Sequence, residues 1–122
     1  MTLHHVQIAC PAGSEEALRE YFGGLLGMVE IPKPPALAAR GGAWFAFPAD
    51  PGNAVLHIGV EADFRPARKA HPAFTWSDLD GLAGRLAGAG YEVVWADASE
   101  TGNRRFHSFD CHGNRIEFVA AS

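Results

Sequence analysis

Three histidines and one glutamate recur at comparable positions in the two halves of this chain. His5 opens the first half and His57 lies near its end, while His71 opens the second half and Glu117 lies near its end. Neutral imidazoles and a carboxylate are donors that a borderline divalent metal such as zinc, nickel, iron or manganese accepts. These residue types and their repeated placement predict one metal site formed by His5, His57, His71 and Glu117.

The strands expected to carry these residues place all four on one kind of face. We expect strands at 3–9, 54–60, 71–76 and 114–120, because apolar and other side chains alternate there. Each candidate has the opposite parity to the bulky apolar residues of its strand, so it lies on the face that helices do not cover. Any one of them alone is more often a solvated or hydrogen-bonded side chain. Four on the same kind of face favour a joint site.

The remaining elements complete an internal repeat. Helices are expected to begin at Ser14, with a hydroxyl cap, and at Ser77 or Asp78, and glycines end both. Further strands are expected at 28–31, 43–47, 91–95 and 103–109, with a loop between 32 and 42. The order is therefore βαβββ followed by βαβββ.

Length and composition favour one globular domain spanning 1–122, with a first module at 1–61, a connector at 62–70 and a second module at 71–122. The 122 residues are 48% hydrophobic and 20% charged, which is ordinary for such a domain. A net charge of −4 argues against a nucleic-acid partner. No apolar run approaches a membrane span and the N-terminus lacks signal-peptide features, so we expect a cytoplasmic protein. Cys10 and Cys111 are expected to be reduced.

Two adjacent arginines are candidates for binding a substrate. Arg104 and Arg105 lie on the strand expected at 103–109. A guanidinium group matches the geometry of carboxylates and phosphates, so either residue could hold an anionic substrate. The alternative is that both are solvated charges at a strand end.

The sequence resembles the vicinal oxygen chelate superfamily, which includes glyoxalase I, fosfomycin-resistance thiol transferases, extradiol dioxygenases, methylmalonyl-CoA epimerase and bleomycin-resistance proteins. The matching segments are 5–9, 21–28 and 110–118, and the resemblance covers nearly the whole chain. It implies an α+β fold in which two βαβββ modules form a curved mixed sheet with helices on the convex face. It also implies a metal in the concavity, bound by His5, His57, His71 and Glu117.

Two departures from the family pattern bear on the chemistry. Glyoxalase I enzymes usually carry Glu at the position of His57, so Glu117 is the carboxylate left here as the catalytic proton-transfer residue. The usual Asp-Pro-x-Gly before the last strand reads Asp110-Cys111-His112-Gly113, although Gly113 keeps the turn chemistry.

The resemblance implies a metal-dependent, glyoxalase-like enzyme that chelates a small oxygenated substrate through neighbouring oxygens. Isomerase, lyase and transferase chemistry all remain open. One alternative is a non-catalytic drug-binding protein of the bleomycin-resistance type, and another is an extradiol dioxygenase. The small size and the resemblance lead us to expect a homodimer, in which modules of two chains jointly build each site.

Overall fold

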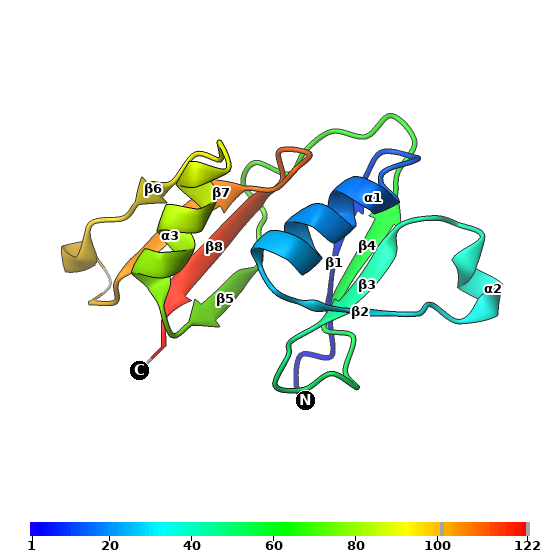
Figure 1. The fold of residues 1–122 in the computed structure, drawn as a ribbon, viewed down its shortest axis with the longest axis horizontal. Helices are drawn as coiled ribbons and strands as arrows, with labels where there is room; N and C mark the ends of the chain where they lie inside the picture. The colour runs from blue at the N-terminus through cyan, green and yellow to red at the C-terminus, as the bar shows by residue number, and fades with distance from the viewer. Residues whose placement is uncertain (101, 122) are drawn as a thin grey trace. The chain divides into compact units, whose positions relative to one another are not determined.

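The computed structural model describes residues 1–100 and 102–121, with the side chain of Ala98 left out. The chain divides into two compact units, Met1–Pro66 and Ala67–Ser122, and the boundary falls inside the expected connector. Each unit contains its own four-stranded mixed sheet (Figure 1). The predicted α+β class and the two βαβββ modules are confirmed. The curvature of the sheet and the placement of helices on its convex face stay predictions.

The first sheet has the strand order β1-β4-β3-β2. Its strands are β1 (Val6–Cys10), β2 (Val29–Ile31), β3 (Ala43–Ala46) and β4 (Leu56–Val60). Strand β1 pairs in parallel with β4, and the other pairings are antiparallel. The helix α1 (Glu15–Leu18) continues as the π-helix η1 (Arg19–Leu25), and together they lie across one face of the sheet (Figure 1). Their buried side chains Leu18, Tyr21 and Phe22 complete the core on that face.

The second sheet repeats this topology in the order β5-β8-β7-β6. Its strands are β5 (Ala73–Trp76), β6 (Val94–Trp95), β7 (Arg105–Phe109) and β8 (Arg115–Ala120). Strand β5 is parallel to β8, as β1 is to β4. The helix α3 (Leu79–Gly88) covers one face and buries Leu79, Leu82 and Leu86 (Figure 1). The helix α3 does not cover the other face, which carries Glu117. Along β8, Glu117 alternates with the buried Ile116 and Phe118.

The helix ends match the sequence expectations in part. Asp78 caps α3, because its Oδ1 accepts a hydrogen bond from the Gly81 N–H at 3.1 Å. Gly27, at φ +72°, takes the left-handed conformation that ends the first helix. The hydroxyl cap predicted at Ser14 is wrong, because Ser14 Oγ donates instead to the carbonyl of Pro11 and cannot cap from there.

Two short helices were not expected. The segment predicted as a loop between 32 and 42 contains α2 (Pro35–Ala38), which starts on a proline whose restricted φ suits the first helical turn. The other is the 3₁₀-helix η2 (Ala98–Glu100). No helix in the described part of the chain is long and apolar enough to cross a membrane. Cys10 is buried and Cys111 is partly buried.

Several predicted strands begin later than expected, and the shifts of β1 and β5 leave His5 and His71 just before these strands rather than inside them. Val6 is the first residue of β1 that pairs with a neighbouring segment, because its N–H donates to the Val55 carbonyl at 3.0 Å. Its partner β4 starts only at Leu56, so the residues before Val6 have no strand to pair with. Pro72 has no N–H to donate, and β5 accordingly starts after it.

A buried polar turn leads into β8 and sets the start of that strand. Asp110 Oδ1 accepts from the backbone N–H groups of His112 at 2.8 Å and Asn114 at 2.9 Å, and its Oδ2 accepts from the Asn114 side chain at 3.1 Å. Asn114 Oδ1 in turn accepts from the Ala67 N–H at 3.0 Å. Gly113 adopts φ +88° in this turn. These contacts fix the register from which Glu117 projects.

Candidate functional site

The two histidines of the first unit lie face to face. The rings of His5 and His57 have centroids 3.9 Å apart and planes 11° apart, which is a stacked arrangement. Trp44, opposite His57 in the β3–β4 register, stacks on His57 at 3.9 Å and 15°. Because two rings cannot occupy the same side of a third, His57 lies between Trp44 and His5. His5 and His57 are therefore in direct contact, while their use as ligands of one metal stays a prediction.

The contacts of His57 define which ring nitrogen is free. Its Nε2 lies 3.1 Å from the carbonyl oxygen of Ala54. A carbonyl only accepts, so Nε2 carries the hydrogen and Nδ1 holds the lone pair of the neutral ring. Burial lowers the pKa of His57 below its usual value, and the nearby His5 lowers it further. The neutral form, which can bind a metal, is thereby favoured.

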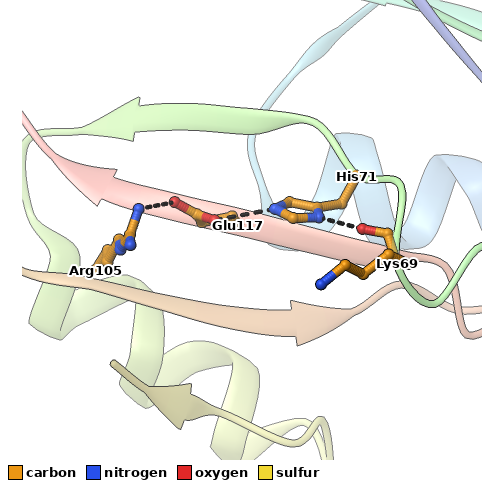
Figure 2. Close-up of polar contacts among 4 residues, drawn as sticks. All are labelled: Lys69, His71, Arg105 and Glu117. Atoms are coloured by element: carbon orange, nitrogen blue, oxygen red, sulfur yellow. Dashed lines mark hydrogen bonds and ion pairs between the residues drawn. The ribbon is translucent and has the colours of Figure 1, made fainter. Parts of the chain in front are cut away.

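His71 and Glu117 form the corresponding pair in the second unit. His71 Nδ1 lies 2.7 Å from the Lys69 carbonyl oxygen, and His71 Nε2 lies 3.0 Å from Glu117 Oε1. Figure 2 shows the chain of contacts continuing from Glu117 Oε2 to Arg105 Nη1, which donates at 3.2 Å. The side chains of His71 and Glu117 are only 25% and 14% exposed, so these groups are partly shielded from water.

The donor set of this second pair fits a divalent metal. Donation from Nδ1 to Lys69 directs the remaining nitrogen, Nε2, toward a carboxylate oxygen, and both atoms have lone pairs when the ring is neutral. A shared proton or a cation is needed to make that contact favourable. Metal–donor bonds of about 2.1 Å at right angles place two donors about 3.0 Å apart, close to the separation of Nε2 and Oε1.

Each unit supplies two candidate ligands rather than a complete set. Among the described residues, no group of three or more His, Cys, Asp or Glu side chains is arranged so that it could hold a metal ion. The structure therefore shows two pairs of candidate ligands, His5 with His57 in the first unit and His71 with Glu117 in the second. Their joint use as one metal site stays a prediction.

The two arginine candidates lie in different environments. Arg105 Nη1 lies 3.2 Å from Glu117 Oε2, and a role of Arg105 in binding a substrate stays a prediction. Arg104 does not join this group, because its guanidinium donates to both carboxylate oxygens of Asp80, next to the start of α3, at 2.8 and 3.2 Å, and also lies over Trp95. Neighbouring residues of an extended chain point to opposite faces, which separates the two.

His107 is a further residue near Glu117 that was not among the candidates predicted from the sequence. It lies directly opposite Glu117 in the β7–β8 register. His107, Arg105, Arg115 and Glu117 line one cavity of about 320 Å³. Burial lowers the pKa of His107, and the positive charge of Arg115 adds to this effect. The alternation of Arg105, His107 and Phe109 along β7 was the signal for this placement.

Solved structures define the class to which this fold belongs. A fosfomycin resistance protein, FosX, from Listeria monocytogenes superposes with a TM-score of 0.72 at 14% identity, over 100% of this chain and 94% of that one. A lactoylglutathione lyase from Agrobacterium tumefaciens gives 0.65 at 17% identity, over 95% and 92%. These likenesses show the fold of the vicinal oxygen chelate superfamily.

A more similar structure narrows the class to a family. A glyoxalase family protein from Bacillus anthracis is 43% identical, with a TM-score of 0.88, over 100% of this chain and 96% of that one. The chain belongs to the glyoxalase family. No protein-family model matches the sequence, and no curated protein matches it significantly.

Proposed function

We propose that this protein is a metal-dependent enzyme that acts on a small molecule with neighbouring oxygen atoms. His5, His57, His71 and Glu117 supply the ligands of one divalent metal ion, which is zinc, nickel, manganese or iron. When bound, such an ion supplies Lewis acidity that stabilises negative charge developing on substrate oxygens. The membership in the glyoxalase family supports this class of activity.

The contact between His71 and Glu117 is the observation that carries the proposal. Lys69 fixes the ring so that Nε2, and not Nδ1, lies 3.0 Å from Glu117 Oε1. Carbonyl contacts that fix the orientation of a histidine ring are common behind metal-binding histidines. In the first unit, the Ala54 carbonyl holds His57 through Nε2, so the Nδ1 of the neutral ring is the atom available to bind a metal.

Glu117 is the residue to which we assign proton transfer. Its Oε2 is oriented by Arg105, and its carboxylate accepts a proton from the substrate and returns one to the product. Arg105 also lies where it could bind an anionic part of the substrate. The identity of His57 leaves no second ligand carboxylate in the proposed set, so a single-base reaction is favoured over one that uses two carboxylates.

Metal content tests the proposal directly. Protein purified without chelator is analysed for metal, and its melting temperature is followed as nickel, zinc or manganese is added to the chelator-treated form. We expect bound metal and a rise in melting temperature, since a ligand of the native state stabilises it. Absence of metal together with no stabilisation would contradict the proposal.

Variants separate binding from proton transfer. His71→Ala is expected to lower metal affinity at least about ten-fold, and Glu117→Gln to lower both affinity and turnover. His112→Gln, in the β7–β8 turn, is the matched control and should bind metal as the parent does. Turnover is measured on metal-loaded protein with methylglyoxal and glutathione or bacillithiol, with fosfomycin, and with catechols under oxygen.

A further inference from the structure

A second cavity lies in the first unit, on the face of the sheet that carries His57. Its volume is about 270 Å³, which is near the lower end of the range for small-ligand pockets. The lining residues come from β1, β3, β4 and the segment around α2: Gln7, Lys33, Leu37, Arg40, Gly41, Trp44, His57, Ile58, Gly59 and Val60. The cavity is therefore built within one unit and includes one predicted metal ligand.

Two glycines hold the α2 segment against the sheet. Gly41 and Gly42 both have φ +79°, a conformation that other residues rarely adopt. A Cβ on Gly42 would lie 2.0 Å from the Ile58 carbonyl oxygen, and one on Gly41 would lie 3.0 Å from Val60 Cγ2. The close approach to β4 thus requires glycine at 42. It gives the cavity a defined wall that carries Lys33 and Arg40.

A third glycine makes room for a polar group on the floor of the cavity. A Cβ on Gly59 would lie 2.5 Å from Gln7 Nε2, so the amide of Gln7 occupies the space above Gly59. Gln7 is also the β1 neighbour of His57 in the strand register. An amide that can donate hydrogen bonds therefore lies beside the imidazole at the floor.

The charge of the cavity has one sign. Lys33 and Arg40 line it, and its described lining residues include no carboxylate. The carboxylate of Glu15 lies outside this lining, 3.9 Å from where a Cβ on Gly41 would be, and lines a neighbouring cavity with Lys33. Lys33 is half-buried and its Nζ donates to the Gly41 carbonyl. An ammonium group has three N–H donors, so this contact leaves two for another acceptor. Two cations without a carboxylate partner in the lining favour an anionic ligand.

We propose that this cavity binds the carboxylate, phosphonate or phosphate group of a small molecule, with Lys33 and Arg40 as its cationic partners and Gln7 as a hydrogen-bond donor. The position of His57 in the same lining places the rest of that molecule beside a predicted metal ligand. The assignment of the bound molecule as the substrate rests on the proposed function. The binding of the anionic group does not.

Titration of the ¹⁵N-labelled, EDTA-treated full-length protein tests the cavity without metal. The probes are benzoate and phenylphosphonate, with benzamide as the neutral analogue, and amide chemical shifts give dissociation constants. We expect both anions to shift Gly41, Gly42 and Gly59, and benzamide to bind at least about ten-fold more weakly than the tighter anion. Comparison of the two anions shows which head group the cavity prefers.

Matched charge-removing variants assign the effect. Lys33→Gln keeps a donor for the Gly41 carbonyl but removes the charge, and Arg40→Gln removes the second charge. Each is expected to weaken anion binding by about ten-fold and to leave benzamide binding unchanged. Arg65→Gln, at an exposed arginine of the same unit outside the cavity lining, should have no effect.

The outcomes distinguish this inference from the proposed function. Equal binding of anions and benzamide, or equal losses in the Arg65→Gln and Arg40→Gln variants, would overturn the anion site even if the protein binds metal. Anion binding that depends on Lys33 and Arg40 in a protein that binds no metal would support the anion site and contradict the proposed function.

Discussion

At the scale of single residues, backbone carbonyls decide which nitrogen each histidine can offer. Ala54 holds His57 at Nε2, whereas Lys69 holds His71 at Nδ1. The two rings therefore present different atoms, Nδ1 from His57 and Nε2 from His71, to any shared ligand. Neither carbonyl could be inferred from the sequence, because each contact depends on how the chain turns before a strand.

Trp44 is expected to hold His57 in place for metal binding. It stacks on the His57 ring at 3.9 Å, on the side away from His5. Trp44→Leu removes this flat surface, so the ring gains rotational freedom and metal affinity should fall about ten-fold or more. Trp44→Phe keeps an aromatic face and should retain most of the affinity. Isothermal titration calorimetry with nickel or zinc measures both.

The metal affinity of a His57→Ala variant shows how much affinity is lost when the ring itself is removed. A Trp44→Leu protein that binds metal as tightly as the parent, while His57→Ala binds it weakly, would show that Trp44 does not position the ring. Melting temperatures of the metal-free variants establish that each one is folded before its affinity is interpreted.

At the scale of elements, strand parity was the reliable part of the sequence prediction. The alternation of Ile116, Glu117 and Phe118 places the carboxylate on the face opposite the core, and the structure confirms this. His57 follows the same rule on β4. Parity is fixed by local chain geometry, so it can be read from the sequence alone.

The ends of the elements were less predictable, because they depend on partners far along the chain. His5 lies outside β1 since β4 starts only at Leu56. The α2 segment was expected as a loop, and its docking on β4 depends on the contact that Gly42 makes with Ile58. The cavity bounded by Lys33 and Arg40 is a product of that docking, so it could not be predicted from the sequence.

The turn between β7 and β8 should leave a signature in the pH dependence of stability. Burial raises the pKa of Asp110, although the N–H groups of His112 and Asn114 oppose this. The native protein therefore binds a proton at Asp110 more tightly than the unfolded chain does. The contribution of Asp110 to the free energy of unfolding is expected to fall as pH rises from about 4 through the raised pKa. The slope is at most about 1.4 kcal/mol per pH unit.

Urea unfolding of the parent and Asp110→Asn proteins across this pH range measures the effect as a difference between the two. Asp97→Asn is the matched control of opposite sign. The Ser99 N–H, which donates to Asp97 at 2.9 Å, lowers the pKa of Asp97, so the stabilising contribution of Asp97 should grow as pH rises toward about 4 and stay constant above it, where that of Asp110 falls. An Asp110 difference that is flat, or that grows with pH, would contradict the prediction.

At the scale of the whole molecule, the internal repeat places two of the four candidate metal ligands in each unit. Each unit has the same strand order, and each contributes one pair of candidate ligands. Neither pair alone offers the three or four donors that a stable transition-metal site usually needs. The repeat was visible in the sequence as two histidine-led halves.

Complementation between inactive chains tests the expected homodimer. One variant lacks the first pair (His5→Ala with His57→Ala), and the other lacks the second (His71→Ala with Glu117→Ala). If each site takes one pair from each of two chains, a mixed dimer keeps one intact site and loses the other. Refolding the variants together at equal amounts should restore about a quarter of the parent's bound metal, since about half of the dimers are mixed. Each variant refolded alone should bind almost none, and a mixture that also binds none would contradict sites shared between chains.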